Sequence, residues 1–219
     1  MASSSSVWRL GPVQLVRRGF SWQASVERST GKAFAQELSR IPVQLPTKHQ
    51  QNNGDPFLKD LLGNYPGWLS RGSVTLGLLQ AVPQSGGGTR LQTRLFGINI
   101  LTFGKPAAQK LALQASSAVR QQAIQWKYPI RDGLFVAPTK QSAAGDLVLT
   151  LRGASDDNNI VVLDTQLVAY RPRVVGAHAP ANPMRIALYL GSQSVVHGYA
   201  MWRFHRFVRG KLLESAKVK

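Results

Sequence analysis

The feature that most constrains the fold of this chain is a pair of alternating segments in its C-terminal half. Residues 146–152 and 160–170 alternate apolar and polar side chains, and the segment between them, 153–159, is rich in Gly, Ser, Asp and Asn. Alternation with a period of two is typical of a strand with one buried face, and a linker of this composition is typical of a turn. These segments therefore predict an antiparallel β-hairpin.

Other segments extend this hairpin into a sheet. Residues 74–82 and 89–103 flank a run of turn residues, 83–88, and a change in the alternation at Phe96-Gly97 predicts a bulge or a sharp bend. A further strand is expected within 128–136. Because short linkers join most of these segments, the sheet is expected to be mostly antiparallel, with about five to six strands.

Three segments have the signals of helices. Asp55 and Pro56 are a typical N-cap and first helical residue, and the apolar spacing that follows them ends at Gly63. Apolar residues at helical spacing also predict a mid-chain helix over 105–126 and a long C-terminal helix over about 184–211. The predicted fold class is α+β: a mostly antiparallel sheet packed by a mid-chain helix and the long C-terminal helix.

The first 20 residues have the composition of an organelle transit peptide. Three arginines and no acidic residue precede Glu27, and serines occupy positions 3–6. The motif Arg18-Gly19-Phe20-Ser21 resembles a cleavage site of the mitochondrial matrix protease, with arginine three residues before the cut. The sequence therefore predicts a transit peptide over 1–20 and a location in the mitochondrial matrix or at the matrix face of the inner membrane.

The remainder of the chain is expected to contain an arm and one domain. Residues 21–54 have little periodicity, and Pro42 and Pro46 disfavour helical conformation in the residues before them, so this segment is predicted to be an extended arm or linker. Residues 55–219 are expected to form a single basic α+β domain. No apolar run approaches the roughly 18 residues that cross a bilayer, so no transmembrane segment is predicted.

The charge of the chain is strongly positive because acidic residues are few. It has 27 Lys and Arg but only 10 Asp and Glu, a formal net charge of +17. Two long spans, 61–131 and 165–213, contain no acidic residue. The surface is therefore expected to attract phosphate groups or acidic proteins. The chain contains no cysteine, which excludes disulfides, thiolate zinc sites and cysteine nucleophiles.

No motif in the sequence indicates catalysis. The glycines of 86–88 precede a predicted strand and are interpreted as a hairpin turn rather than a phosphate-binding loop. His197 and His205 are eight residues apart, about 80° around an ideal helix, and no carboxylate lies near them in the sequence to complete a metal site. No catalytic residue, cofactor or metal is predicted, and we favour a non-enzymatic function.

The end of the predicted C-terminal helix interleaves aromatic and basic residues. Arginines at i, i+3 and i+6 share one side of the helix, and a lysine follows. Guanidinium groups in such an array can bind phosphates while the apolar side packs on protein. The residues predicted to bind an anionic partner are Arg171, Arg173, Arg185, Arg203, Arg206, Arg209 and Lys211, and the predicted anchors are Trp202 and Phe207.

Our leading hypothesis is a non-enzymatic accessory or structural subunit of a large mitochondrial assembly. The assembly would be either the mitoribosome or an inner-membrane respiratory complex, and the partners would be other subunits together with ribosomal RNA or anionic lipid. The alternative is a small-molecule- or lipid-binding protein, or an enzyme, with a cavity of several hundred Å³ between a curved sheet and the C-terminal helix. The residues predicted to line that cavity are Tyr128, Tyr170, His197, Tyr199 and Trp202.

Overall fold

The computed structural model describes residues 7–15, 19–43, 56–71, 75–113, 121–138, 143–154, 159–176 and 179–217. Within these residues ten strands form one antiparallel sheet in the order β1-β2-β3-β10-β9-β8-β6-β5-β4, and β7 also pairs with β8. The strands are β1 (Val7–Leu15), β2 (Phe20–Glu27), β3 (Lys32–Pro42), β4 (Leu79–Pro83), β5 (Thr89–Thr93), β6 (Asn99–Phe103), β7 (Ala107–Leu113), β8 (Gln121–Asp132), β9 (Asp146–Gly153) and β10 (Ile160–Tyr170).

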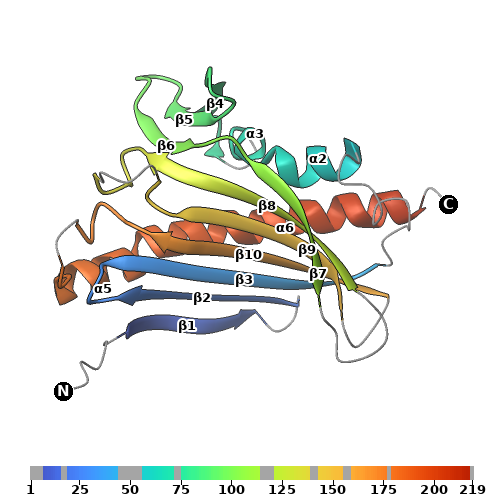
Figure 1. Cartoon of the computed structure of the whole chain (residues 1–219), viewed down its shortest axis with the longest axis horizontal. Helices are drawn as coiled ribbons and strands as arrows, with labels where there is room; N and C mark the ends of the chain where they lie inside the picture. Colours follow the sequence, from blue (N-terminus) through green and yellow to red (C-terminus); the bar gives the residue numbers. More distant parts are fainter. Residues whose placement is uncertain are drawn as a thin grey trace.

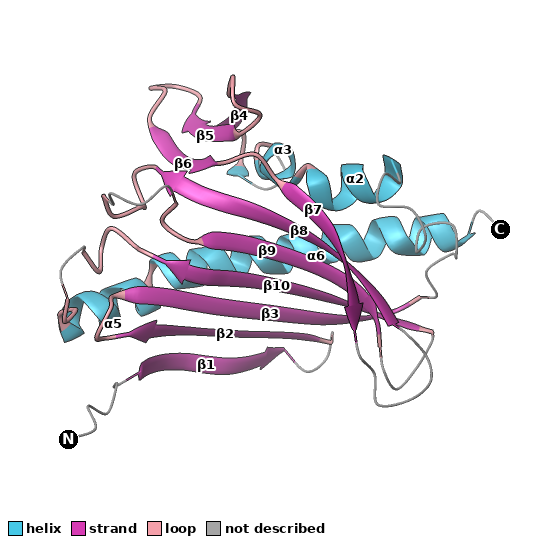
Figure 2. Ribbon diagram, in the orientation of Figure 1, coloured by secondary structure: helices cyan, strands magenta, loops and turns pink. Residues whose placement is uncertain are grey.

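The helices are α2 (Pro56–Gly63), α3 (Tyr65–Leu69), α5 (Pro183–Gly191) and α6 (Gln193–Lys217). Helix α6 runs behind the strands from α5 to the C-terminal end (Figure 1), and it contacts β2 and β3. Helices α2 and α3 lie beyond β8, on the side of the sheet away from β1 (Figure 2). This arrangement confirms the predicted α+β class: an antiparallel sheet, of ten strands rather than the expected five to six, with a short mid-chain helix and a long C-terminal helical segment packed on it.

The core lies between the sheet and α6. Inward positions alternate along the central strands, as in β10, where Val161, Leu163, Thr165 and Leu167 are buried. On the helix side, four residues at helical spacing are fully buried against them: Met201, Phe204, Val208 and Leu212. The face of α6 that meets the sheet is therefore the predicted apolar stripe.

The hairpin predicted from the alternation of 146–152 and 160–170 is confirmed. β9 and β10 pair antiparallel, with Leu163 opposite Leu151 and Leu167 opposite Leu147. The bend predicted at Phe96-Gly97 is a complete turn, since 89–103 divides into β5 and β6, which pair with each other. Gly97 has a φ of +63°, a conformation that glycine adopts at low cost.

The helix predicted over 105–126 is wrong for the part that the structure describes, and residues 114–120 of that prediction lie outside the described residues. Residues 107–113 form β7, which pairs with β8 in a continuous register from Ala107 opposite Lys127 to Leu113 opposite Gln121. The Ala, Gln and Leu residues of this segment have helical propensity, but strand pairing in the sheet overrides it. In β8 the buried residues Trp126, Tyr128 and Ile130 follow a strand period that continues past the expected helix end.

The segment 21–54, predicted to be an extended arm or linker, contributes strands to the sheet. β3 lies between β2 and β10, and it pairs with both. Its inward side chains include Ala33, Ala35, Glu37 and Ser39, all of them buried. Small and polar residues in inward positions give no hydrophobic alternation, so this strand was not predicted from the sequence.

The N-terminal residues pair with the same part of the sheet. β1 pairs antiparallel with β2 and lies within the segment predicted to be a transit peptide. Removal of that segment stays a prediction. Among the residues that the structure describes, no helix is both long and apolar enough to span a bilayer.

The predicted C-terminal helix is divided in two. Asn182 caps α5 by accepting a hydrogen bond from the backbone N–H of Met184 at 2.9 Å. Ser192 has φ −127° and ψ −81°, which interrupts the helix before α6 begins. Helix α6 then continues six residues beyond the predicted end at 211, to Lys217.

Candidate functional site

A large cavity lies between the β4–β6 strands, α3 and the α5–α6 segment. Its volume is about 890 Å³. The floor consists of buried apolar side chains of the sheet, including Leu91, Phe103, Ile130 and Leu147. Tyr65 of α3 and Tyr189 of α5 contribute further walls. The space is therefore enclosed mainly by apolar groups from elements that are far apart in the sequence.

Aromatic packing fixes α3 against α6 at one side of the cavity. The ring of Phe204 lies 5.0 Å from that of Tyr65 and 4.9 Å from that of Trp68, both in edge-to-face geometry. The Tyr128 hydroxyl donates a hydrogen bond to the carbonyl of Leu62 at 2.6 Å, which ties α2 to the sheet. These contacts hold the cavity wall in place without filling the cavity.

A small group of polar atoms lies at the end of the cavity near the α5–α6 junction. The Tyr170 hydroxyl donates to the carbonyl of Phe135 and accepts from the side-chain amide of Gln193 at 2.8 Å. Burial raises the pKa of Tyr170 above its usual value, so the phenol stays protonated. Both side chains line the cavity, together with the exposed Arg173.

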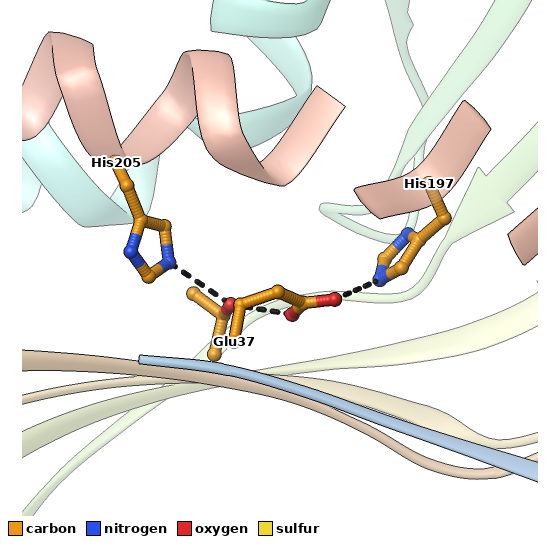
Figure 3. A network of polar contacts seen from close by, with 4 residues as sticks. Glu37, His197 and His205 are labelled. Carbon is orange, nitrogen blue, oxygen red and sulfur yellow. Dashed lines mark hydrogen bonds and ion pairs between the residues drawn. The ribbon is translucent and has the colours of Figure 1, made fainter. Parts of the chain in front are cut away.

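A buried polar network lies beneath α6, centred on Glu37 of β3 (Figure 3). Oγ1 of Thr165 donates to Oε2 of Glu37 at 2.7 Å and lies 3.1 Å from Nε2 of His205. Nδ1 of His205 lies 2.7 Å from Oγ of Ser39. Because the Thr165 hydroxyl donates its proton to Glu37, the Thr165 oxygen accepts a hydrogen bond from Nε2–H of His205. Nδ1 of His205 then accepts from the Ser39 hydroxyl.

This network is electrically neutral at neutral pH. Burial raises the pKa of Glu37 to about 8, although the hydrogen bond from Thr165 acts in the opposite direction. Burial also lowers the pKa of His197 to about 4 and that of His205 to about 3. Glu37 is therefore protonated and both imidazoles are uncharged.

The network reaches the cavity wall at His197. Oε1 of Glu37 lies 3.4 Å from Nε2 of His197, and both atoms are buried without a well-formed hydrogen bond among the described residues. Since both groups are neutral, this contact is not an ion pair. His197 itself lines the cavity, so an incompletely satisfied polar pair lies at its edge.

The residues predicted to line a cavity lie in three different places. Tyr170, His197 and Tyr199 line the 890 Å³ cavity. Tyr128 is buried in the core beside it, bonded to Leu62. Trp202 instead lines a separate groove of about 450 Å³ between α6 and the β2–β3 strands.

That second groove brings together some of the predicted anion-binding residues. Arg206 and Arg209 are exposed and line it together with Arg40 of β3. The guanidinium carbon of Arg206 lies 5.0 Å from the centre of the Trp202 ring, in cation–π geometry. Two guanidinium groups of α6 therefore border the groove, whereas Arg40 alternates with the inward Ser39 and Ile41 and belongs, like Phe34, to the outward set of β3.

The other predicted basic and anchoring residues lie elsewhere. Lys211 forms an exposed ion pair with Glu214 at 2.9 Å, and Arg203 is half-buried on α6. Phe207 packs on Trp68, with the Arg71 guanidinium over its ring. Arg171 and Arg173 follow β10, and Arg185 is on α5, near the opposite end of α6 from Arg209. The structure therefore does not unite the predicted residues into one surface.

Sequence reasoning missed Glu37, Ser39 and Thr165. Their contacts in the network join residues that are 40 to 166 positions apart in the sequence. The sequence offered little signal for them, because the small and polar residues around Glu37, such as Ala35 and Ser39, show no apolar alternation. Among the described residues, no group of three His, Asp or Glu side chains is placed to hold a metal ion.

No protein-family model matches this chain, and no curated protein matches it significantly. Its function must therefore be inferred from the cavity, the buried network and the basic groove.

Proposed function

We propose that this protein binds an apolar, lipid-like small molecule in the cavity between β4–β6, α3 and α5–α6. The observation that carries this proposal is the cavity volume of about 890 Å³ with a floor of buried apolar side chains. Ligand pockets typically occupy about 300–1,000 Å³ and combine apolar walls with a few polar groups. The alternative hypothesis from the sequence is thus the one that the geometry supports best.

The physical driving force is removal of apolar ligand surface from water. Each buried methylene contributes about 0.8 kcal/mol, so an acyl chain gains affinity with its length. Gln193, Tyr170 and Arg173 line the cavity close together around the carbonyl of Phe135, where they can bind the polar end of the ligand. A molecule with a long apolar part and one polar end matches this distribution.

Native mass spectrometry tests this function. Purified protein is incubated with a total lipid extract, desalted, and measured under native and denaturing conditions. We expect a bound mass of a single lipid-like molecule that is lost on denaturation. Only the mass of the unliganded chain, at every lipid concentration, would contradict the proposal.

A second candidate function is favoured by the basic groove. Arg206 and Arg209 border about 450 Å³ beside Trp202, which suits an anionic group of RNA, lipid or an acidic protein. This groove supports the leading sequence hypothesis, in which the protein is an accessory subunit of a large mitochondrial assembly. The assembly, the partner and the mitochondrial location are proposals at this stage.

Size fractionation of organelle extract, with and without ribonuclease, tests the second function. We expect wild-type protein to migrate with a large particle and the R206Q/R209Q double variant to migrate as a free chain. The K59Q variant, which changes an exposed lysine on α2, is the control and should migrate like wild type. Wild-type protein that migrates alone would exclude this function.

A further inference from the structure

The mouth of the cavity is formed by apolar side chains that water can reach. Six large apolar residues both line the cavity and are exposed: Leu78, Leu134, Phe135, Leu188, Val196 and Tyr199. Leu78 and Val196 are 65% and 68% exposed. Scattered exposed apolar residues are ordinary, but a ring of them around a cavity opening indicates an interaction site.

The apolar surface continues beyond the cavity onto the turn between β5 and β6. Leu95 is 81% exposed and Phe96 is 74% exposed, and neither lines the cavity. The backbone N–H of Arg94 donates to the carbonyl of Leu78 at 2.9 Å, which places this turn beside the mouth. Leu76, before β4, is 87% exposed at a φ of +53°. A leucine in this disfavoured conformation, turned to water, is unusual.

Two arginines flank this surface, and one exposed acidic residue, Asp132, lies two positions before Leu134. Arg94 adjoins Leu78, and its Nε donates to the carbonyl of Leu79 at 3.2 Å. Arg173 lines the cavity and is exposed. Most of the mouth residues lie in the two spans that contain no Asp or Glu, 61–131 and 165–213. The mouth therefore combines protruding apolar side chains with flanking arginines, the composition of a surface that binds an anionic bilayer.

We propose that this mouth docks on an anionic lipid bilayer. Its exposed apolar side chains lie in the membrane interface, and the cavity opens to the lipid. A bilayer fits better than a protein partner because the exposed groups continue directly into the cavity walls, so a lipid-like molecule can pass between them without entering water. The docking proposal depends only on the exposed residues around the mouth, whereas the exchange of ligand also rests on the proposed function.

Vesicle co-sedimentation tests the docking. Vesicles of phosphatidylcholine are compared with vesicles that also contain phosphatidylserine. We expect wild-type protein to prefer the anionic vesicles and L95S/F96S to lose at least tenfold in vesicle affinity. The R94Q variant should lose about fivefold on anionic vesicles, since one basic residue near such a surface contributes about 1 kcal/mol.

Two controls separate this inference from the proposed function. Phe34 is an exposed aromatic residue on the outer side of β3, so F34S should retain wild-type vesicle binding. Leu95 and Phe96 are outside the cavity, so L95S/F96S should retain ligand binding by native mass spectrometry. Equal vesicle binding by wild type and L95S/F96S would overturn the docking proposal. The proposal would also be overturned if wild-type protein self-associated instead of binding vesicles and L95S/F96S abolished that self-association.

Discussion

Glu37 is the residue whose environment differs most from what its chemistry favours. Its side chain is fully buried, and its neighbours are Thr165 and two neutral imidazoles rather than a cation. An ionised carboxylate at this position would lack compensation, so the group is held in its protonated form. The stability of the fold therefore depends on pH through the titration of Glu37 and of the two imidazoles.

The effect of pH on stability has opposite signs for the carboxyl group of Glu37 and for the two imidazoles. Between about 4.3 and about 8, folded protein keeps a proton on Glu37 that the unfolded chain loses, so stability falls as pH rises through this window. For His197 and His205 the folded pKa is lower than the unfolded value of about 6.5, so stability falls as pH drops below that value. The contribution of the network to the free energy of unfolding is therefore greatest near about pH 6.5. On the alkaline side it falls by about 1.4 kcal/mol per pH unit.

We predict that E37Q removes the alkaline decline in stability. Glutamine has nearly the same shape but does not titrate, so its free energy of unfolding should change little between about pH 6.5 and about pH 8.5. Urea denaturation at the two pH values measures this. E214Q, a change of the same kind at an exposed glutamate, should keep the wild-type slope. An unaltered slope in E37Q would show that Glu37 is already ionised.

The roles of individual residues were only partly accessible from the sequence. Tyr170, His197 and Tyr199 were predicted as cavity residues because aromatic and histidine side chains lay on elements expected to face each other. Glu37 was not, because its strand lacks apolar alternation and its partners are far away in the chain. Proximity in space between β3, β10 and α6 is a tertiary property, and no local pattern encodes it.

At the scale of elements, α6 serves two sites along its length. Val196, His197, Tyr199 and Ala200 from its first half line the cavity. Trp202, Arg206 and Arg209, further along the helix, border the basic groove. The position of this helix on the sheet therefore controls the shape of both sites.

A glycine sets how closely α6 approaches β2. A Cβ at Gly198 would lie 2.9 Å from the ring of Trp22, whereas a Cβ at Gly210 would meet nothing within 4 Å. We predict that G198A lowers the free energy of unfolding by about 1–3 kcal/mol because the helix must shift. G210A should instead stabilise the helix by about 0.5–1 kcal/mol. Denaturant unfolding of both variants measures this, and equal effects would refute the close approach.

The elements themselves differ in how well the sequence predicted them. The β9–β10 hairpin was accessible because its strands alternate strictly and are joined by a short polar turn. The segment 105–126 was assigned to a helix because apolar residues recur in it at helical spacing, yet its described residues 107–113 pair with 121–127 as strands. The helical period thus failed where the partner strand supplies the stabilisation.

At the scale of the whole molecule, the sheet and α6 leave space between them on one side. The class of the fold and the possibility of a cavity against the C-terminal helix were predictable from the order of elements. The volume was not, because it depends on how the β4–β6 strands and α3 are placed beside α6. The cavity and its apolar mouth together form the central feature of this account.

The most direct test of that feature is a titration with an apolar fluorescent probe in a variant with a filled cavity. Ala200 lines the cavity on α6, so A200W should fill part of it. Ala187 on α5 is exposed and outside the cavity, so A187W carries the same change without that effect. We predict that A200W binds the probe at least tenfold more weakly than A187W and wild type, with unchanged circular dichroism. Equal affinities in all three proteins would contradict a ligand-binding cavity.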